Sequence, residues 1–154
     1  MGNSPRILAA IDLGETSHSI LEHAIEMAVE MHAAVDVLYV WEPPRLIRPD
    51  LMVYLEEGGR TLSLAEVSQN QARAELAKIL ERLGPAGAEL TARVAVGSPA
   101  AEVVKTALCD EHDLIVMGTR GRSGLSHVVI GSVAEKVVRL APCPVLVIPP
   151  ADAR

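Results

Sequence analysis

Strand-like and helix-like patterns alternate from one end of the chain to the other, and this alternation constrains the fold more than any other feature. Four short apolar runs predict β-strands over residues 6–11, 35–41, 114–117 and 145–148, and alternation of apolar residues predicts a further strand over 90–96. Apolar residues at helical spacing predict helices over about residues 17–31, 64–83, 98–110 and 133–140. Such alternation is typical of a parallel sheet with helices on both faces and right-handed crossovers.

The sequence therefore predicts an α/β protein of three layers, α/β/α, around a five-stranded parallel sheet. The 154 residues are enough for one domain with a substantial core, and they contain no internal repeat and no linker. We expect a single domain over residues 1–154. Residues 42–62, which include three prolines and the pair Gly58-Gly59, show no interpretable pattern.

Composition argues against several classes of partner. Hydrophobic residues make up 49% and charged residues 22%, which is typical of a folded protein. The net charge of −6 opposes general affinity for nucleic acid or an anionic membrane, and aromatic residues, at 2%, offer little for stacking on bases. No apolar run approaches about 20 residues, and the first residues lack the apolar core of a signal peptide. We expect a soluble cytoplasmic protein that binds neither nucleic acid nor membrane.

Cysteine and histidine patterns indicate no metal site. Cys109 and Cys143 have no metal-ligand spacing and suggest no disulfide framework. His18 and His23 lie five residues apart, so they do not share a helix face as an i,i+4 metal pair does. We expect the other histidines at the surface, near helix ends or in the loop after the fourth strand: His32, His112 and His127.

The segment from Gly118 to Ser132 has the properties of a phosphate-binding loop. It follows an apolar run and leads into a predicted helix, so it forms a strand, a glycine-rich loop and a helix in succession. Gly118, Gly121 and Gly131 are spaced as G-x2-G-x9-G, and glycine permits positive φ and close approach of a ligand. A helix N-terminus adds free N–H donors and a dipole that suits phosphate.

This loop differs from the commoner nucleotide motifs. No glycine is followed by lysine, which rules out G-x4-G-K-[S/T], and no G-x-G-x-x-G follows the first strand. A loop of this length is uncommon in a compact domain unless it is functional. Arg120 and Arg122 make it locally positive in an acidic chain, which favours a small anionic ligand; solvated loop charges are the plainer interpretation.

With these residues the chain resembles the universal stress protein family, over essentially its whole length. The matching segments are ILAAIDLGETS, VLYVWEP, VGSPAAEVVKTA and DLIVMGTRGRSGLSHVVIGSVAEKVVRLAPCPVLVIP. The resemblance implies a sheet of strand order 3-2-1-4-5, of the adenine nucleotide alpha-hydrolase-like type. It also implies ATP binding, because ATP-binding members carry the signature G-x2-G-x9-G-[S/T], which is intact here at Gly118, Gly121, Gly131 and Ser132.

The resemblance also implies which residues form the site. Asp12 would contact ribose or, through water, a metal, while Ala10 and Ile11 would line the base pocket and the Val40 backbone would meet the adenine edge. Ala10 stands where some ATP-binding relatives have proline. Ribose and phosphate contacts would come from the fourth strand, the loop and the helix start, at Met117, Gly118, Gly121, Arg122, Gly131, Ser132 and Val133.

Three of these residues have simpler interpretations. In the simpler interpretation, Asp12 only caps the turn that follows it. Val40 would be an ordinary buried strand residue, and Ser132 would be only the N-cap of its helix.

The expected function is an ATP-binding universal stress protein that acts as a nucleotide-dependent switch or scaffold. The ligand would be ATP, ADP or AMP, with Mg²⁺ held mainly by the phosphates. No catalytic residue is assigned, because no Ser-His-Asp or Cys-His arrangement is recognisable and hydrolysis without a positioned base or arginine finger is slow. The alternatives are a slow ATPase, or an interaction module that binds another nucleotide, such as cyclic AMP, or none.

The last strand predicts a homodimer. In the strand order 3-2-1-4-5 this strand lies at a sheet edge, and an exposed apolar edge promotes aggregation unless something covers it. The same strand of a second copy would cover it, through Val145, Leu146, Val147 and Ile148. Coverage of this edge by residues 42–62 or by a helix is the competing interpretation.

Overall fold

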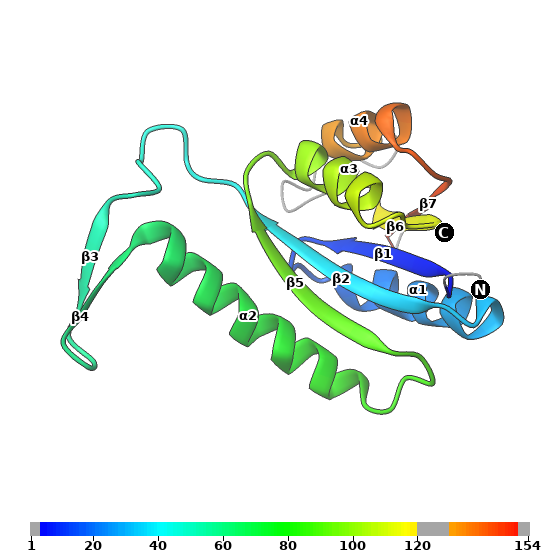
Figure 1. Ribbon diagram of the computed structural model, residues 1–154, viewed down its shortest axis with the longest axis horizontal. Helices are drawn as coiled ribbons and strands as arrows, with labels where there is room; N and C mark the ends of the chain where they lie inside the picture. The colour runs from blue at the N-terminus through cyan, green and yellow to red at the C-terminus, as the bar shows by residue number, and fades with distance from the viewer. Residues whose placement is uncertain (1–3, 120–129, 151–154) are drawn as a thin grey trace.

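The central sheet has the predicted strands in the predicted order. The computed structural model describes residues 4–119 and 130–150. Five parallel strands form the sheet in the order β5-β2-β1-β6-β7 (Figure 1). These strands are β1 (Arg6–Ile11), β2 (Ala34–Trp41), β5 (Leu90–Val96), β6 (Leu114–Gly118) and β7 (Val145–Ile148). Numbered along the chain, this is the order 3-2-1-4-5, so the predicted α/β fold is confirmed.

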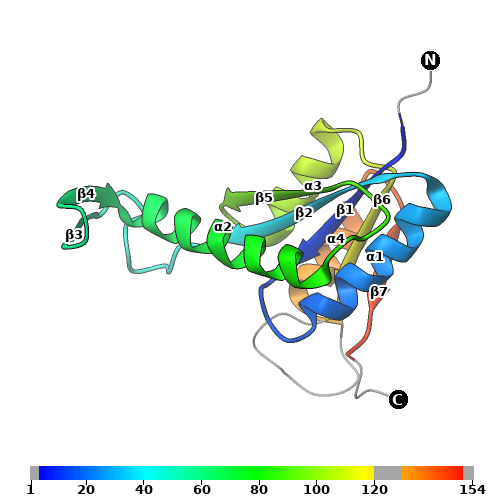
Figure 2. The ribbon, with the colours of Figure 1, turned by 90° about the horizontal axis from the view of Figure 1, so that it is seen from below.

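Helices cover both faces of the sheet, as the apolar runs predict. On one face α1 (Ser17–Met31) and α2 (Leu64–Leu83) pack on a core that includes Ile7, Leu21 and Leu76, all fully buried. On the other face α3 (Pro99–Cys109) and α4 (Ser132–Leu140) pack on a core that includes Leu8 and Ile115 (Figure 2). Strands that are covered on both faces need apolar residues in succession, which explains why β1 and β6 are almost uninterrupted apolar runs.

Two helix starts differ in how their first N–H groups are satisfied. Ser63 and Glu66 form a reciprocal capping box at the start of α2, where Ser63 accepts a hydrogen bond from the backbone N–H of Glu66. Ser98 occupies the N-cap of α3, but its side chain makes no capping bond there, and Pro99 fills the first turn. The capping box fixes the point where α2 begins.

A β-hairpin occupies much of the segment that shows no interpretable sequence pattern. Strands β3 (Met52–Leu55) and β4 (Arg60–Ser63) pair antiparallel, and β4 leads directly into α2. The turn between them contains Gly58 and Gly59 at positive φ, 89° and 58°, a conformation that glycine adopts without strain. The hairpin extends away from the sheet at the amino-terminal end of α2 (Figures 1 and 2).

Within residues 4–119 and 130–150, no helix is both long enough and apolar enough to span a bilayer.

Candidate functional site

The candidate site lies where the strand order reverses. Strand β1 pairs with β2 on one side and with β6 on the other, with Ala10 in register with both Leu38 and Met117. The chain leaves β1 toward α1 on one face of the sheet and leaves β6 toward α4 on the opposite face. Parallel α/β sheets bind ligands in the crevice that such a divergence opens at the carboxyl ends of the strands.

A cavity of about 480 Å³ lies at this position, within the size range of small-molecule sites. Nine of the eleven residues singled out from the sequence lie in its wall: Ala10, Ile11, Asp12, Val40, Met117, Gly118, Gly131, Ser132 and Val133. The remaining two, Gly121 and Arg122, lie outside the described residues, as do Arg120 and His127. Asp12 and the start of α4 thus line the same cavity.

Asp12 is held in place by its own turn. Its Oδ1 atom accepts a hydrogen bond from the backbone N–H of Gly14 at 2.8 Å and one from the hydroxyl of Ser17 at 3.4 Å. Leu13 has a φ of 64°, an uncommon value for a residue other than glycine, and this conformation turns the chain back toward the carboxylate. Asp12 thus caps its turn, as one interpretation expects, and also lines the cavity.

The start of α4 presents backbone donors to the same cavity. Gly131 is the N-cap residue, and Ser132 is the first residue of the helix, so the interpretation of Ser132 as the N-cap is wrong. The first bond within the helix runs from the Glu135 N–H to the Gly131 carbonyl. The N–H groups of the residues between them, which include Ser132 and Val133, therefore have no partner within the helix, as in every helix N-terminus.

Gly131 differs from expectation in two respects. Its φ is −62°, so this position does not need the positive φ that glycine permits. Its N–H donates to the Thr119 carbonyl at 2.6 Å and is thereby occupied. This bond joins the two ends of the glycine-rich segment, and Thr119 in turn donates from its N–H to the Ile148 carbonyl of β7 at 3.1 Å. The feature of Gly131 that still favours a ligand is its lack of a side chain in the cavity wall.

The described part of the cavity wall is acidic. Asp12 and Glu42 are its charged residues, and no Lys, Arg or His among the described residues lines it. A phosphate group in the cavity would therefore depend on the N–H donors and dipole of α4, on cations, and on loop charge of the kind that the sequence analysis assigns to Arg122.

Sequence reasoning missed several residues of the wall. At the end of β2 the wall includes both aromatic residues of that strand, Tyr39 and Trp41, together with Glu42. Pro99 and Val103 come from the first turns of α3. Trp41 and Glu42 could have been predicted, because they lie at the carboxyl end of a strand next to the switch point. Pro99 and Val103 could not, because their approach to the cavity depends on how α3 packs.

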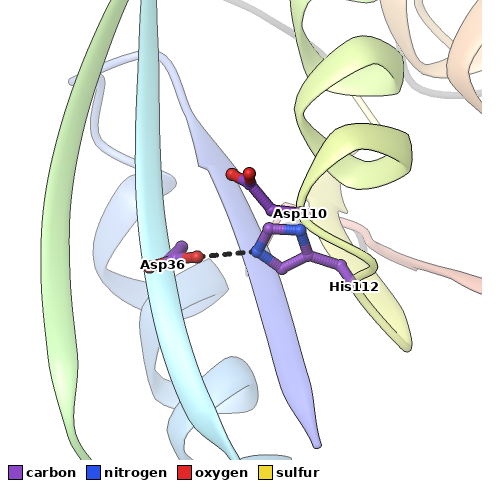
Figure 3. A group of neighbouring side chains, drawn as sticks. All are labelled: Asp36, Asp110 and His112. Atoms are coloured by element: carbon purple, nitrogen blue, oxygen red, sulfur yellow. Dashed lines mark hydrogen bonds and ion pairs between the residues drawn. The ribbon is translucent and has the colours of Figure 1, made fainter. Parts of the chain in front are cut away.

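A second cluster of polar side chains lies near the amino ends of the strands, at the opposite end of the strands from the cavity. Asp36 on β2 is buried, and its Oδ2 atom accepts from Nε2 of His112 at 2.8 Å (Figure 3). The Arg6 guanidinium also donates to Oδ2 of Asp36. Arg93 donates to Asp110 and lies 3.6 Å from Oδ2 of Asp36. The cluster joins β1, β2, β5 and the end of α3.

Candidate metal-ligand atoms of Asp36, Asp110 and His112 lie within 4.8 Å of one another. The two carboxylates are already paired with the guanidinium groups of Arg6 and Arg93, so the formal charges of these four groups cancel. A cation at this position would have to displace both arginines. The cluster therefore acts as an ion-pair clamp on the amino edge of the sheet, in which two charges compensate two others.

The surface position predicted for His112 is wrong. The residue is 5% exposed, and its Nδ1 atom is buried with no hydrogen-bond partner among the described residues. Its backbone N–H bonds to the Ala107 carbonyl, which turns the chain after α3 back under the helix toward Asp36. This contact joins residues 76 positions apart, and nothing in the local sequence signals it.

Comparison with known proteins matches nearly the whole chain to one family. The sequence profile of the universal stress protein family matches residues 4–149. Universal stress protein MJ0531 of Methanocaldococcus jannaschii is 34% identical over 143 residues, which cover 93% of this chain and 81% of that protein. Universal stress protein YxiE of Bacillus subtilis is 33% identical over 149 residues, which cover 93% of this chain and 97% of that protein.

Solved structures agree on the fold. A structure of MJ0577, a universal stress protein of the same archaeon, superimposes with a TM-score of 0.76 at 28% identity and covers 97% of this chain and 98% of that one. A universal stress protein of Archaeoglobus fulgidus in complex with dAMP gives a TM-score of 0.66 at 24% identity, covering 96% of this chain and 99% of that one. A universal stress protein in complex with cAMP gives 0.69 at 22% identity, covering 94% and 96%.

The ion-pair clamp gives a stability prediction. Asp36→Asn leaves Arg6 and Arg93 without the carboxylate that they share, and we expect a loss of about 3 kcal/mol in unfolding free energy. The matched control is Asp50→Asn, which removes an ion pair between Arg48 and Asp50, both well exposed, and should cost less than about 1 kcal/mol. Urea unfolding followed by circular dichroism measures both, and equal losses would contradict the clamp.

The same clamp gives a pH dependence. The hydrogen bond from Arg93, and then the charges of Arg93, Arg6 and His112, hold the pKa of Asp110 below its usual value of 3.8. The resulting stabilisation is fully present above that value and is lost as the pH falls through the lowered pKa. Arg93→Gln should raise the Asp110 pKa toward its usual value, as read from the carboxyl resonance in an NMR titration. An unchanged pKa in this variant would assign the shift to another cause.

Proposed function

The chain belongs to the universal stress protein family, and we propose that it binds an adenine nucleotide, ATP in the first place, and acts as a nucleotide-dependent switch or scaffold in the stress response. The observation that carries this proposal is the cavity at the switch point, which has a fixed carboxylate on one side and the N-terminus of α4 on the other. Such a cavity offers separate places for a hydroxyl-bearing sugar and for phosphate.

The proposed orientation follows the distribution of polar groups along the cavity wall. The base would lie against Ala10, Val40 and the end of β2, where the wall is largely apolar. The β2 backbone there would form hydrogen bonds with the edge of the adenine. The ribose hydroxyls would donate to Asp12, an acceptor already held by Gly14 and Ser17. The phosphates would accept from the first N–H groups of α4, at Ser132 and Val133.

Magnesium fits this arrangement as a companion of the nucleotide. The described wall carries Asp12 and Glu42 but no basic side chain, so a triphosphate would bring more negative charge into an already acidic cavity. A Mg²⁺ ion held mainly by phosphate oxygens, with Asp12 reaching it through water, would offset that charge. Arg122, which the sequence places in the loop between β6 and α4, is the proposed cationic side chain.

Adenine nucleotides are the probes for this cavity. The solved complexes with cAMP and dAMP are of proteins below 25% identity to this chain, so the proposal depends on the cavity itself and not on those ligands. ATP, AMP and cAMP share the adenine base and differ in phosphate number and ribose closure, so their relative affinities distinguish an ATP switch from a cyclic-nucleotide module. A cytoplasmic location is part of the same proposal, and cell fractionation would test it.

The first binding prediction concerns the cavity wall at α4. Gly131→Val should abolish or weaken ATP binding at least tenfold, because a branched side chain would stand where the phosphates approach. The variant should fold, since the extended conformation of this residue, φ −62° and ψ 158°, is open to valine. Titration calorimetry measures the affinity, with the adjacent exposed Ile130→Val as the matched control. Unchanged affinity in a folded Gly131→Val protein would refute the phosphate position.

A second binding prediction concerns the turn at Asp12. A Cβ added at Gly14 would stand 2.9 Å from Oδ1 of Asp12, so Gly14→Ala should displace that carboxylate while leaving the core intact. We expect affinity for AMP to fall severalfold, with a smaller loss for analogues that lack ribose hydroxyls. Equal losses for AMP and for its dideoxy analogue would place the Asp12 carboxylate away from the ribose.

We further propose a homodimer through β7. This strand pairs with β6 and lies at the edge of the sheet, with its residues mostly half-buried. A second β7, antiparallel across a two-fold axis, would satisfy the edge groups that a parallel sheet leaves unpaired. Proteins regulated by such a switch would then bind the dimer.

Val147→Lys tests this dimer. Placing a charge in the proposed strand-to-strand contact should convert a dimer into a folded monomer or lower its solubility. Sedimentation velocity at micromolar concentration, with circular dichroism as the folding control, provides the measurement. A wild-type chain that sediments as a monomer would overturn the proposal.

A further inference from the structure

The hairpin β3–β4 carries an exposed apolar surface that nucleotide binding does not use. Five large apolar residues at or just before β3 are exposed: Leu46, Ile47, Leu51, Met52 and Tyr54. Leu46 is 98% accessible, and Tyr54 is 64% accessible. The other exposed large apolar residues in the described chain are spread over α1, α3 and the region of α4. A concentration of this kind within one short segment marks an interaction surface.

The backbone of the hairpin points to the kind of partner. Strands β3 and β4 form a sheet of two strands, to which no third strand is added by the residues that the structure describes. Two-stranded hairpins are marginally stable alone, and an apolar free edge is a template for a further strand. Strand β4 continues into α2, whereas β3 forms the outer edge of the hairpin and carries exposed Met52 and Tyr54.

Opposite charges flank β3, which makes the strand complementary to itself. Arg45 and Arg48 precede it, with Asp50 bonded to Arg48 at 2.7 Å, and Glu56 and Glu57 follow it. When two copies of such a strand pair antiparallel, the residues before one strand lie beside the residues after the other. This arrangement brings arginine toward glutamate at both ends, whereas a parallel arrangement would bring like charges together.

We propose that the outer edge of β3 is a self-association surface, on which β3 of a second copy of this chain pairs antiparallel about a two-fold axis. The two hairpins then form one four-stranded sheet, in which the Met52 and Tyr54 side chains of the two copies pack side by side on one face. This contact is independent of the nucleotide cavity. It also does not compete with β7, which lies on the far side of the molecule (Figure 1).

The first test measures self-association by sedimentation equilibrium in the Val147→Lys background, where the β7 contact is removed and the β3 contact, as the weaker of the two, forms only toward about 100 µM. The double variant Met52→Lys/Tyr54→Lys should raise the dissociation constant at least tenfold. The matched control, Leu108→Lys/Leu140→Lys, adds the same charge at apolar residues that are 63% and 58% exposed on the helices, and it should change the constant less than twofold. A dissociation constant unchanged by the hairpin variant, or equally changed by the control, overturns the proposal, as does a Val147→Lys chain that stays monomeric at about 100 µM.

The second test locates the contact. In a chain with Cys109→Ser and Cys143→Ser, the variant Val53→Cys should form an intermolecular disulfide under mild oxidation, because β3 faces β3. The control Thr61→Cys, on the inner strand β4 of the same hairpin, should not. Cross-linking through Thr61→Cys alone, or through neither position, overturns pairing at the β3 edge. Both variants change only the hairpin, so circular dichroism and nucleotide affinity report separately that the body remains folded.

Discussion

The position of β1 between β2 and β6 is the constraint on which the rest of the molecule depends. Parallel pairing on both sides buries Ile7, Leu8 and Ala9 of β1 completely, and the chain leaves β1 and β6 toward opposite faces. The carboxyl ends of these strands therefore diverge, and the cavity lies in that divergence. Asp12 and the first turn of α4, 120 positions apart at Ser132, become neighbours of one cavity through topology alone.

The two edges of the sheet have different chemistry. At the amino edge, Asp36, Asp110, Arg6 and Arg93 compensate one another's charges, and His112 is buried against Asp36. At the carboxyl edge, the described residues leave polar groups without such compensation: a carboxylate in a tight turn and the free N–H groups of a helix. Charges that pair internally stabilise a fold, whereas polar groups that remain available bind ligands. We therefore assign the ligand site to the carboxyl ends of the strands.

Periodicity predicted the strands and helices closely, because burial of the central strands and of one face of each helix fixes the apolar pattern. The predicted ranges 6–11 and 90–96 match β1 and β5 to the residue. The hairpin at 52–63 was not predicted, since neither strand has a buried residue and β3 alternates only between exposed and half-buried positions. At the site, the resemblance to the universal stress protein family, which rests partly on the glycine spacing, named nine residues that line the cavity. His112, the conformation of Leu13 and the bond from Gly131 to Thr119 depend on tertiary contacts that no local pattern contains.

Amide chemical-shift mapping with ATP and Mg²⁺ tests the central claim most directly, because it reports the position of the ligand as well as its binding. The account predicts saturable shifts at Asp12, Val40, Ser132 and Val133, around the cavity, and none at Asp36 or His112 on the opposite edge. Shifts confined to the amino edge, or no shifts with ATP, AMP or cAMP at millimolar concentration, would contradict it.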